Sequence, residues 1–257
     1  MRDEPTVDSW VRRYHPAPAA EVRLACLPHA GGSASFYFPM SKALGPAVEV
    51  LAVQYPGRQD RRKEACIEDI AELADLVAER LRPWAADRPL AIFGHSMGAT
   101  LGFEVAQRFQ HDGAPPPVLF VSGRRAPSRH RAETVHLRDD DGLLAEIRAL
   151  SGTDRQLLDD DELLRGMLPA IRADYRAIEL YRYQPRPPLS VSIHALVGTS
   201  DPRVDIEDAR AWREHTTGQF DLHTFPGGHF YLNAQAAQVI DLVAAELSTL
   251  SRTARPC

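Results

Sequence analysis

The sequence LAIFGHSMGATLGFEVAQRF, residues 90–109, decides the fold class of this chain. It begins with a short apolar run, passes through the pattern G-x-S-x-G at residues 94–98, and continues as an apolar helical stretch. A nearly continuous apolar run is typical of a strand that is covered on both faces. Strand, glycine-bounded serine and helix in this order predict a sharp turn that projects the serine above a sheet.

Working outward from this segment, apolar runs and helical stretches alternate through most of the 257 residues. The runs expected as strands are residues 22–26, 48–53, 90–93, 118–121, 191–197 and 220–225. The stretches expected as helices are residues 67–82, 97–111, 206–215 and 231–250. Such alternation predicts an α/β protein with a mostly parallel central sheet flanked by helices. We expect one domain over residues 1–257.

The segment from about residue 124 to residue 188 departs from this rhythm. It contains an arginine-rich loop, a helix near residues 139–150 and a second helical region near residues 160–183, and no strong strand. Prolines 185, 187 and 188 should then end the helix. Long insertions in compact domains are often functional. Two interpretations stay open, an ordinary pair of packing helices and a helical lid over a pocket.

Composition and charge exclude several classes of protein. Hydrophobic residues make up 44% of the chain, which excludes disorder as its main state, and the net charge of −5 gives no nucleic-acid footprint. Cys26, Cys66 and Cys257 are odd in number and widely spaced, which argues against a disulfide framework and a zinc site. No signal peptide or membrane span is visible. We therefore expect a cytoplasmic protein without metal or cofactor.

Ser96 is the predicted nucleophile, and it needs a base that is oriented by an acid. In proteins with this turn the chain order is serine, acid, histidine, with both partners after later strands. Asp201 follows the run at 191–197 in this way, and His229 follows the run at 220–225. Because the carboxyl ends of parallel strands share one edge of the sheet, these three side chains should meet there. His95, inside the turn, should point away from Ser96.

The other acids and histidines have structural interpretations. Asp205 should cap a helix, and Asp221 opens a strand at the opposite edge. His194 and His223 lie within strands, and His215 is expected on a helix surface.

Acyl transfer from a serine also needs donors for the developing oxyanion. One should be the backbone N–H of Met97, and the other should come from the glycine-containing loop at residues 27–33. Within that loop we choose the N–H of Ala30. His29 is interpreted as a side chain that fixes the loop by hydrogen bonding.

Four runs now carry a family resemblance: LPHAGGSASFYFPM, VQYPGRQDRRKE, IFGHSMGATLGFEVA and FPGGHFYL. Together they resemble the type II thioesterases that accompany polyketide synthases and nonribosomal peptide synthetases, over residues 23–247. The PHAGG and YPGR runs are much more specific than G-x-S-x-G alone.

The resemblance implies an α/β-hydrolase fold with its helical lid at the insertion, and a triad of Ser96, Asp201 and His229 with Ala30 and Met97 as oxyanion donors. It implies hydrolysis of acyl thioesters on the phosphopantetheine arm of acyl or peptidyl carrier proteins, which removes aberrant or stalled groups. The carrier protein is the expected partner. The absence of a coiled-coil seam or repeat favours a monomer. In the lid, Leu143, Leu144, Leu163 and Met167 are expected to select the acyl group.

Basic residues follow two of the expected strands: Arg58, Arg61, Arg62 and Lys63 after the second, and Arg124, Arg125, Arg129 and Arg131 after the fourth. Carrier proteins are usually acidic, so these groups are expected either to steer docking or to be offset by local acids on a solvated surface.

Rival interpretations remain open at this point. A generic carboxylesterase would share the triad without needing a carrier, and a fatty-acyl carrier thioesterase would prefer medium or long chains. A non-catalytic carrier-binding protein would have no need of the ordered serine, aspartate and histidine. A chain-terminating thioesterase domain would carry large flanking regions.

Overall fold

A computed structural model describes residues 9–151 and 161–253 of the chain. In these residues the predicted alternation of strands and helices forms a seven-stranded sheet. The strands are β1 (Val11–Arg12), β2 (Val22–Leu27), β3 (Val48–Val53), β4 (Leu90–His95), β5 (Val118–Ser122), β6 (Ser192–Gly198) and β7 (Phe220–Phe225). Their order in the sheet is β1-β3-β2-β4-β5-β6-β7. All neighbours pair in parallel except β1, which pairs antiparallel to β3. The mostly parallel sheet is therefore confirmed, with one short antiparallel edge strand added.

The helices largely occupy the predicted stretches. They are α1 (Phe38–Leu44), α2 (Ile70–Ala85), α3 (Met97–His111), α4 (Asp140–Ser151), α5 (Asp161–Leu180), α6 (Ile206–Arg210), α7 (Tyr231–Ala234) and α8 (Ala236–Thr253). Helix α2 begins at Ile70 rather than at 67, because the Asp69 side chain accepts from the N–H of Glu72 at 2.8 Å and caps it there. The stretch at 206–215 continues from α6 as a 3₁₀ turn over Ala211–His215, and the last stretch is divided at Gln235.

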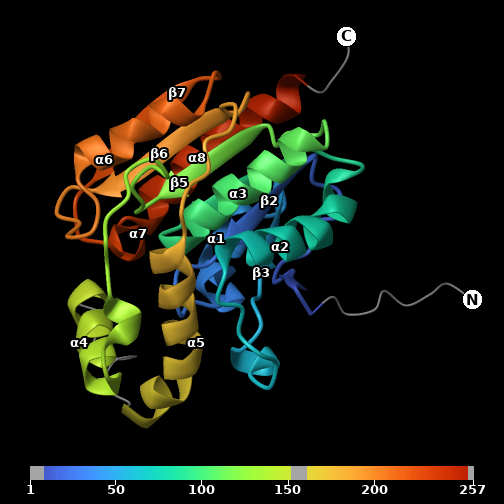
Figure 1. The fold of residues 1–257 in the computed structure, drawn as a ribbon. Helices are drawn as coiled ribbons and strands as arrows, with labels where there is room; N and C mark the ends of the chain where they lie inside the picture. The colour runs from blue at the N-terminus through green and yellow to red at the C-terminus, as the bar shows by residue number, and fades with distance from the viewer. Residues whose placement is uncertain (1–8, 152–160, 254–257) are drawn as a thin grey trace, which may run out of the picture.

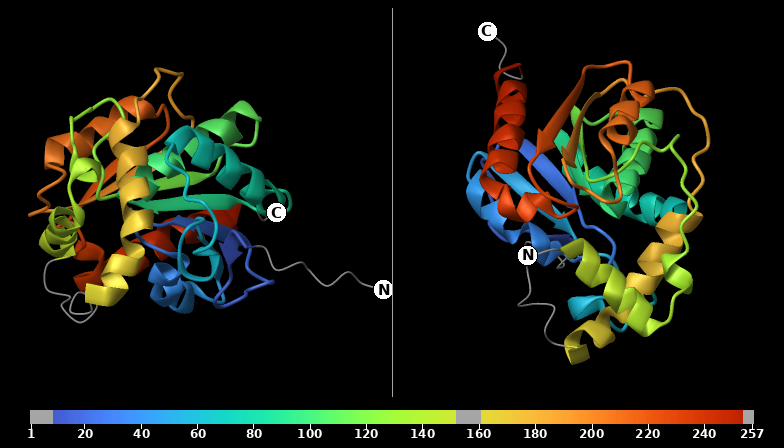
Figure 2. Two further views of the ribbon diagram at one scale, coloured as in Figure 1. Left: turned by 60° about the horizontal axis from the view of Figure 1, so that its bottom comes forward. Right: turned by 90° about the vertical axis from the view of Figure 1, so that its left-hand side faces the viewer.

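Helices cover both faces of the sheet, which is why its central strands are apolar on both sides. On one face, α2 and α3 pack Leu73 and Phe103 into a core with Ile92 of β4. On the other, α8 packs Val243 into a core with Phe93. Figure 1 shows α2 and α3 in front of the sheet, and Figure 2 shows α8 on its far side.

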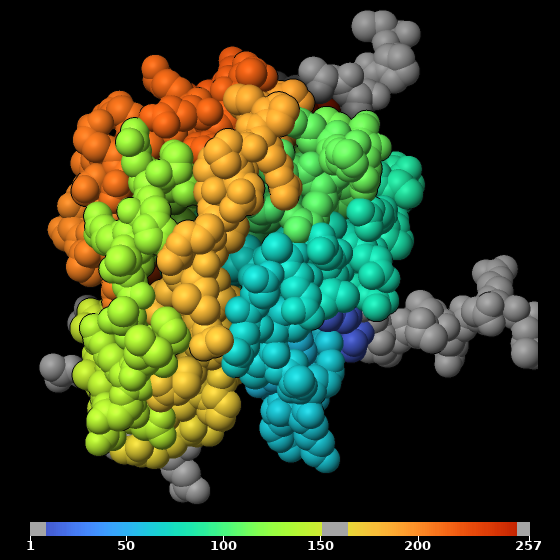
Figure 3. Space-filling model, viewed as in Figure 1, coloured from blue at the N-terminus to red at the C-terminus, as the bar shows by residue number. Residues whose placement is uncertain are grey.

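Segment 124–188 contributes α4 and α5 and has a small apolar core of its own. That core is formed by Val135, Leu143, Leu144, Leu164, Leu168 and Ile171. The two helices lie side by side beyond the sheet, and α5 runs from the outer end of the segment back to α3 (Figures 1 and 3). The segment thus stands at the edge of the sheet where β4, β5 and β6 end.

Candidate active site

The turn after β4 has the strained geometry that the motif predicts. Ser96 has φ +55° and ψ −117°, an unusual conformation for a residue with a side chain. A Cβ at Gly94 would lie 2.0 Å from the carbonyl oxygen of Gly98, and one at Gly98 would lie 2.0 Å from that of Leu27. Glycine is therefore required on both sides of Ser96, because the neighbouring backbone leaves no room for a side chain.

The three predicted side chains meet at one edge of the sheet. Nδ1 of His229 lies 2.9 Å from Oδ2 of Asp201, and Nε2 of His229 lies 3.0 Å from Oγ of Ser96. The other oxygen of Asp201 accepts from the N–H of Arg203 at 2.8 Å, which fixes the carboxylate. Donation from Nδ1 to Asp201 leaves Nε2 free to accept the serine proton. The arrangement can therefore activate the serine hydroxyl as a nucleophile.

The glycine-containing loop at residues 27–33, called the oxyanion loop below, reaches the space beside Ser96 through Ala30. Ala30, Ser96, Met97 and His229 line the same cavity. Among the amides of the loop, that of Gly31 donates to Asp174 at 2.7 Å, and that of Gly32 donates to the carbonyl of His29. Within the described residues the N–H of Ala30 has no hydrogen-bond partner, which leaves it available as a donor. Met97 is the first residue of α3, where a backbone N–H has no partner within the helix.

Two further histidines pack behind the site in neutral form. His95 is fully buried, and burial and the neighbouring His229 hold its pKa well below the usual range. Its Nδ1 lies 2.9 Å from Oγ of Ser122, so it points away from Ser96 as expected. Burial, followed by the charges of His229 and Arg58, lowers the pKa of His29 to about 3. Nδ1 of His29 has no hydrogen-bond partner within the described residues, so the expectation of a loop-fixing hydrogen bond is wrong.

The other candidates have the structural roles expected of them, with one exception. Asp205 caps α6 by accepting from the N–H of Asp208 at 2.7 Å. His194 and His223 lie in adjacent strands with their ring nitrogens 3.2 Å apart. His215 is buried, with Nε2 2.8 Å from Oγ of Ser128, and is not on a helix surface. Its ring packs against the rings of Phe103 and Tyr183. The charged residues Arg213 and Glu214 next to it in the sequence gave no indication of this burial.

The cavity beside Ser96 is small, with a volume of about 30 Å³. Segment 124–188 supplies much of its wall through Leu150, Tyr175 and Ile178. Leu143 and Leu144 are instead buried in the segment's own core, and Met167 lines a separate groove beside the oxyanion loop. These three side chains therefore do not line the cavity beside Ser96, and the expectation that they select the acyl group stays a prediction. The side chain of Leu163 lies outside the described residues.

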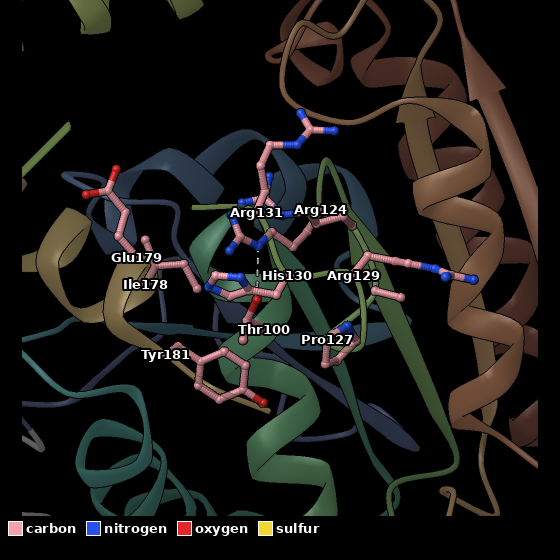
Figure 4. A pocket seen from close by; sticks show the side chains of 11 residues that line it. Thr100, Arg124, Pro127, Arg129, His130, Arg131, Ile178, Glu179 and Tyr181 are labelled. Carbon is pink, nitrogen blue, oxygen red and sulfur yellow. Dashed lines mark hydrogen bonds between the residues drawn. The ribbon is translucent and has the colours of Figure 1, made fainter. Parts of the chain in front are cut away.

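Arg124 separates this cavity from a second one of about 20 Å³. Arg124, Ile178 and Glu179 line both spaces, and Figure 4 shows the Arg124 side chain bonded to Thr100 within the second. Nε of Arg124 donates to Oγ1 of Thr100 at 3.2 Å. Burial, followed by the nearby charge of Arg125, lowers the pKa of Arg124 to about 10. The guanidinium remains charged at neutral pH and closes the end of the cavity.

Most of the basic residues considered for steering are bound to acids. The ion pairs are Arg58 with Asp174, Arg61 with Glu64, Arg125 with Glu133, Arg129 with Glu214, and Arg131 with Asp208. Within the part of the chain that the structure describes, Arg62 and Lys63 are exposed without an acidic partner. Local acids therefore offset five of the eight charges, and only a small basic group is left at the surface.

Asp174 and its partner Arg58 were not recognised as site residues from the sequence. Asp174 contacts the oxyanion loop from α5, and 116 residues separate it from Arg58. A signal was present, because Asp174 stands three residues after Ile171 and four before Ile178, on the apolar stripe of an amphipathic helix. A carboxylate on a buried stripe requires a partner.

Neither a metal site nor a membrane span is found in the described residues. No group of three histidine, cysteine or acidic side chains there is placed to hold a metal ion. None of the described helices is long and apolar enough to cross a bilayer. Cys26 is buried in the core and Cys66 is half-buried, both as free thiols, and Cys257 lies outside the described residues.

Comparisons with known proteins agree with this geometry. The family model described as "Thioesterase domain" matches residues 22–247. A probable cadicidin biosynthesis thioesterase of Streptomyces griseus is 53% identical over 95% of this chain, which spans 66% of that longer protein. Thioesterase PikA5 of Streptomyces venezuelae is 51% identical over 96% of this chain and 89% of its own length.

Among solved structures, the type II thioesterase BorB from the borrelidin biosynthetic cluster superposes with a TM-score of 0.90 at 54% identity. The match covers 95% of this chain and all of BorB. Human thioesterase 2, at 23% identity and a TM-score of 0.67, shares the fold. The chain therefore belongs to the thioesterase family, as a type II thioesterase and thioester hydrolase with the α/β-hydrolase fold.

Proposed function

We propose that this enzyme removes stalled or aberrant acyl groups from the phosphopantetheine arm of a carrier protein in polyketide or nonribosomal peptide synthesis. The observation that carries the proposal is the contact of 3.0 Å between Oγ of Ser96 and Nε2 of His229, beside the N–H groups of Ala30 and Met97. The relatives support the biosynthetic setting, since their names refer to cadicidin and borrelidin biosynthesis.

In the first half of the reaction, Ser96 forms an acyl-enzyme. Oγ attacks the thioester carbonyl carbon while Nε2 of His229 takes the hydroxyl proton. The carbonyl oxygen becomes an oxyanion, which accepts from the N–H groups of Ala30 and Met97. When the carbon–sulfur bond breaks, His229 returns the proton to the departing thiol of the arm. Asp201 holds the ring in the required tautomer and stabilises its charged form.

In the second half, water releases the acyl group. His229 takes a proton from a water molecule, whose oxygen attacks the acyl carbon of the Ser96 ester. The same two backbone donors stabilise the second oxyanion. Collapse returns the proton to Oγ of Ser96 and frees the carboxylic acid, so the carrier arm is left as a free thiol.

The size of the cavity favours short acyl groups. The cavity beside Ser96 has a volume of about 30 Å³, far below the roughly 300–1,000 Å³ of pockets that hold drug-sized ligands. Segment 124–188 acts in this proposal as the lid that bounds the acyl cavity.

The test compares a panel of acyl groups on a carrier protein with simple esters of the same acids. Hydrolysis should be fastest for acetyl and propionyl thioesters on the carrier, and Ser96→Ala should lose about 10⁶-fold in kcat while remaining folded. Faster hydrolysis of the simple esters would favour a carboxylesterase. A preference for long acyl chains would favour a fatty-acyl carrier thioesterase. Binding of the carrier without turnover would make the protein a non-catalytic partner.

A further inference from the structure

A buried ion pair joins α5 to the loop after β3. Nη1 of Arg58 lies 2.6 Å from Oδ2 of Asp174, and Nη2 lies 2.9 Å from Oδ1. The side chains are only 5% and 2% exposed, respectively. Burial opposes the charge on Arg58, yet the Asp174 carboxylate holds the pKa of Arg58 above its usual range. The segment beyond the sheet is thus anchored at one position by a bidentate contact without solvent.

Both partners also hold the oxyanion loop. Oδ2 of Asp174 accepts from the N–H of Gly31 at 2.7 Å, and Nη1 of Arg58 donates to the carbonyl of Gly32 at 3.2 Å. Gly31 has φ +74°, and a Cβ there would lie 2.5 Å from Cγ1 of Ile171. Helix α5 therefore packs directly on the loop backbone, one residue after the proposed oxyanion donor.

This contact determines which way the loop faces. The N–H of Ala30 belongs to the same planar peptide unit as the carbonyl of His29, which accepts from the N–H of Gly32 at 2.9 Å. Asp174 holds the N–H of Gly31 and Arg58 holds the carbonyl of Gly32 in this same turn, so the two side chains limit rotation of the peptide unit that carries the N–H of Ala30. Oxyanion donors act through such preorganisation, since a donor that must reorient during the reaction loses much of its effect.

Stability alone does not account for a charged pair at this position. Replacement of a buried ion pair by well-packed apolar side chains is often neutral or stabilising. Of the two charged side chains, Asp174 also supplies an acceptor at the loop, which an apolar side chain would lack. The cost of burying the charges is understandable if that acceptor serves the chemistry.

We propose that Asp174, held by Arg58, is a positioning residue that aims the N–H of Ala30 at the oxyanion. The inference rests on the proposed function, because it takes Ala30 as an oxyanion donor. It gives α5 a second role: the helix that bounds the acyl cavity also fixes the catalytic loop.

Two double variants separate this role from a merely structural one. Arg58→Gln with Asp174→Asn removes both charges and keeps an oxygen that can accept from Gly31. Arg58→Met with Asp174→Leu removes both charges and the acceptor. With acetyl-pantetheine as substrate, we expect the polar pair to keep kcat within about threefold of the parent and the apolar pair to lose about 100-fold, with KM nearly unchanged in both.

A second readout reports on the oxyanion itself. A trifluoromethyl ketone analogue of acetyl-pantetheine is attacked by Ser96 to give an anionic adduct, whereas the corresponding amide analogue binds without reaction. The double variant with the apolar pair should bind the ketone more weakly, by about the factor lost in kcat. Its affinity for the amide should be unchanged. Asp140→Asn is the matched control, because Asp140 pairs with Arg172 of α5 at 2.7 Å without contacting the oxyanion loop.

Equal turnover of the two double variants, both folded, would overturn the inference, and so would equal weakening of ketone and amide. If the apolar pair does not fold, Asp174→Asn and Asp174→Ala carry the same test, because both lose the charge and only the first keeps an acceptor. Full activity of Ser96→Ala in the parent would instead refute the proposed function, so the two failures are distinguishable.

Discussion

The carboxyl edge of the sheet and segment 124–188 meet at Ser96, and they are built in different ways. At the edge, Ser96, Asp201 and His229 each follow closely after a strand of the sheet, so local backbone geometry sets their positions. In the segment, side chains such as Asp174 reach the site from a helix whose placement depends on distant contacts. We therefore expect changes at the edge to slow all substrates alike, and changes in the segment that leave the oxyanion loop intact to reorder them.

The largest effect in this comparison is expected for Asp201→Asn. The amide can hold His229 in the tautomer that presents a proton to Ser96, so kcat should fall by about 10⁴ for every acyl group tested. Steady-state kinetics over an acetyl-to-octanoyl series would measure this. Asp205→Asn is the control, since it retains a side-chain oxygen to cap α6 and should stay close to the parent. Greater damage from the control would assign the acid to Asp205.

The contrast between the two regions also explains what could be predicted. The bounds of β3, β7 and α3 match the sequence expectation, because apolar runs, helical periodicity and turn residues are local signals. The meeting of Ser96, Asp201 and His229 could be predicted because each follows the end of a strand that the sequence also predicted. Strand β1 was missed, since Val11–Arg12 is too short for a pattern and forms only by pairing with β3.

Inside segment 124–188 the sequence predicted two helices but not their inward faces. Leu143 and Leu144 looked suited to an acyl pocket, yet they fill the segment's own core, since two amphipathic helices must first bury their stripes against each other. The cavity is lined instead by residues such as Tyr175 and Ile178. Their position depends on how the two helices pack against the rest of the protein. Asp174 is the exception: it lies in the segment, but we expect its substitution to slow all substrates alike, as substitutions at the carboxyl edge do.

A smaller and selective effect is expected for Arg124→Ala. Arg124 is part of the wall between the cavity at Ser96 and the adjoining one, so its removal should join them. Longer acyl chains should gain about tenfold in kcat/KM relative to acetyl, because the joined space admits further methylenes and burial of about two of them beside Ile178 and Tyr181 contributes about 0.8 kcal/mol each. Competition between acetyl and hexanoyl thioesters on one carrier would measure the ratio. An unchanged ratio in a folded variant would mean that chain length is limited elsewhere.

The smallest effect concerns how α4 is held. Glu146 of α4 pairs with Arg203, whose N–H fixes Asp201, and also with Arg138 at 2.9 Å. Glu146→Gln should weaken this attachment, lower Tm by about 2–4 °C and leave acetyl-pantetheine turnover within about twofold. If α4 moves to admit the arm, carrier-bound bulky groups should react about two to three times faster, since gating steps can set the observed rate.

The matched control for this last change is Asp141→Asn, which affects the same helix without touching the attachment. Asp141 pairs with Arg165 of α5 at 2.8 Å, within the segment, and both side chains are exposed. It should leave Tm and the acyl ranking unchanged, because exposed pairs contribute little. Should Glu146→Gln instead slow acetyl-pantetheine as strongly as bulky groups, Arg203 would be acting through Asp201. Glu146 would then affect catalysis on every substrate, as the residues of the carboxyl edge do, although it lies in the segment.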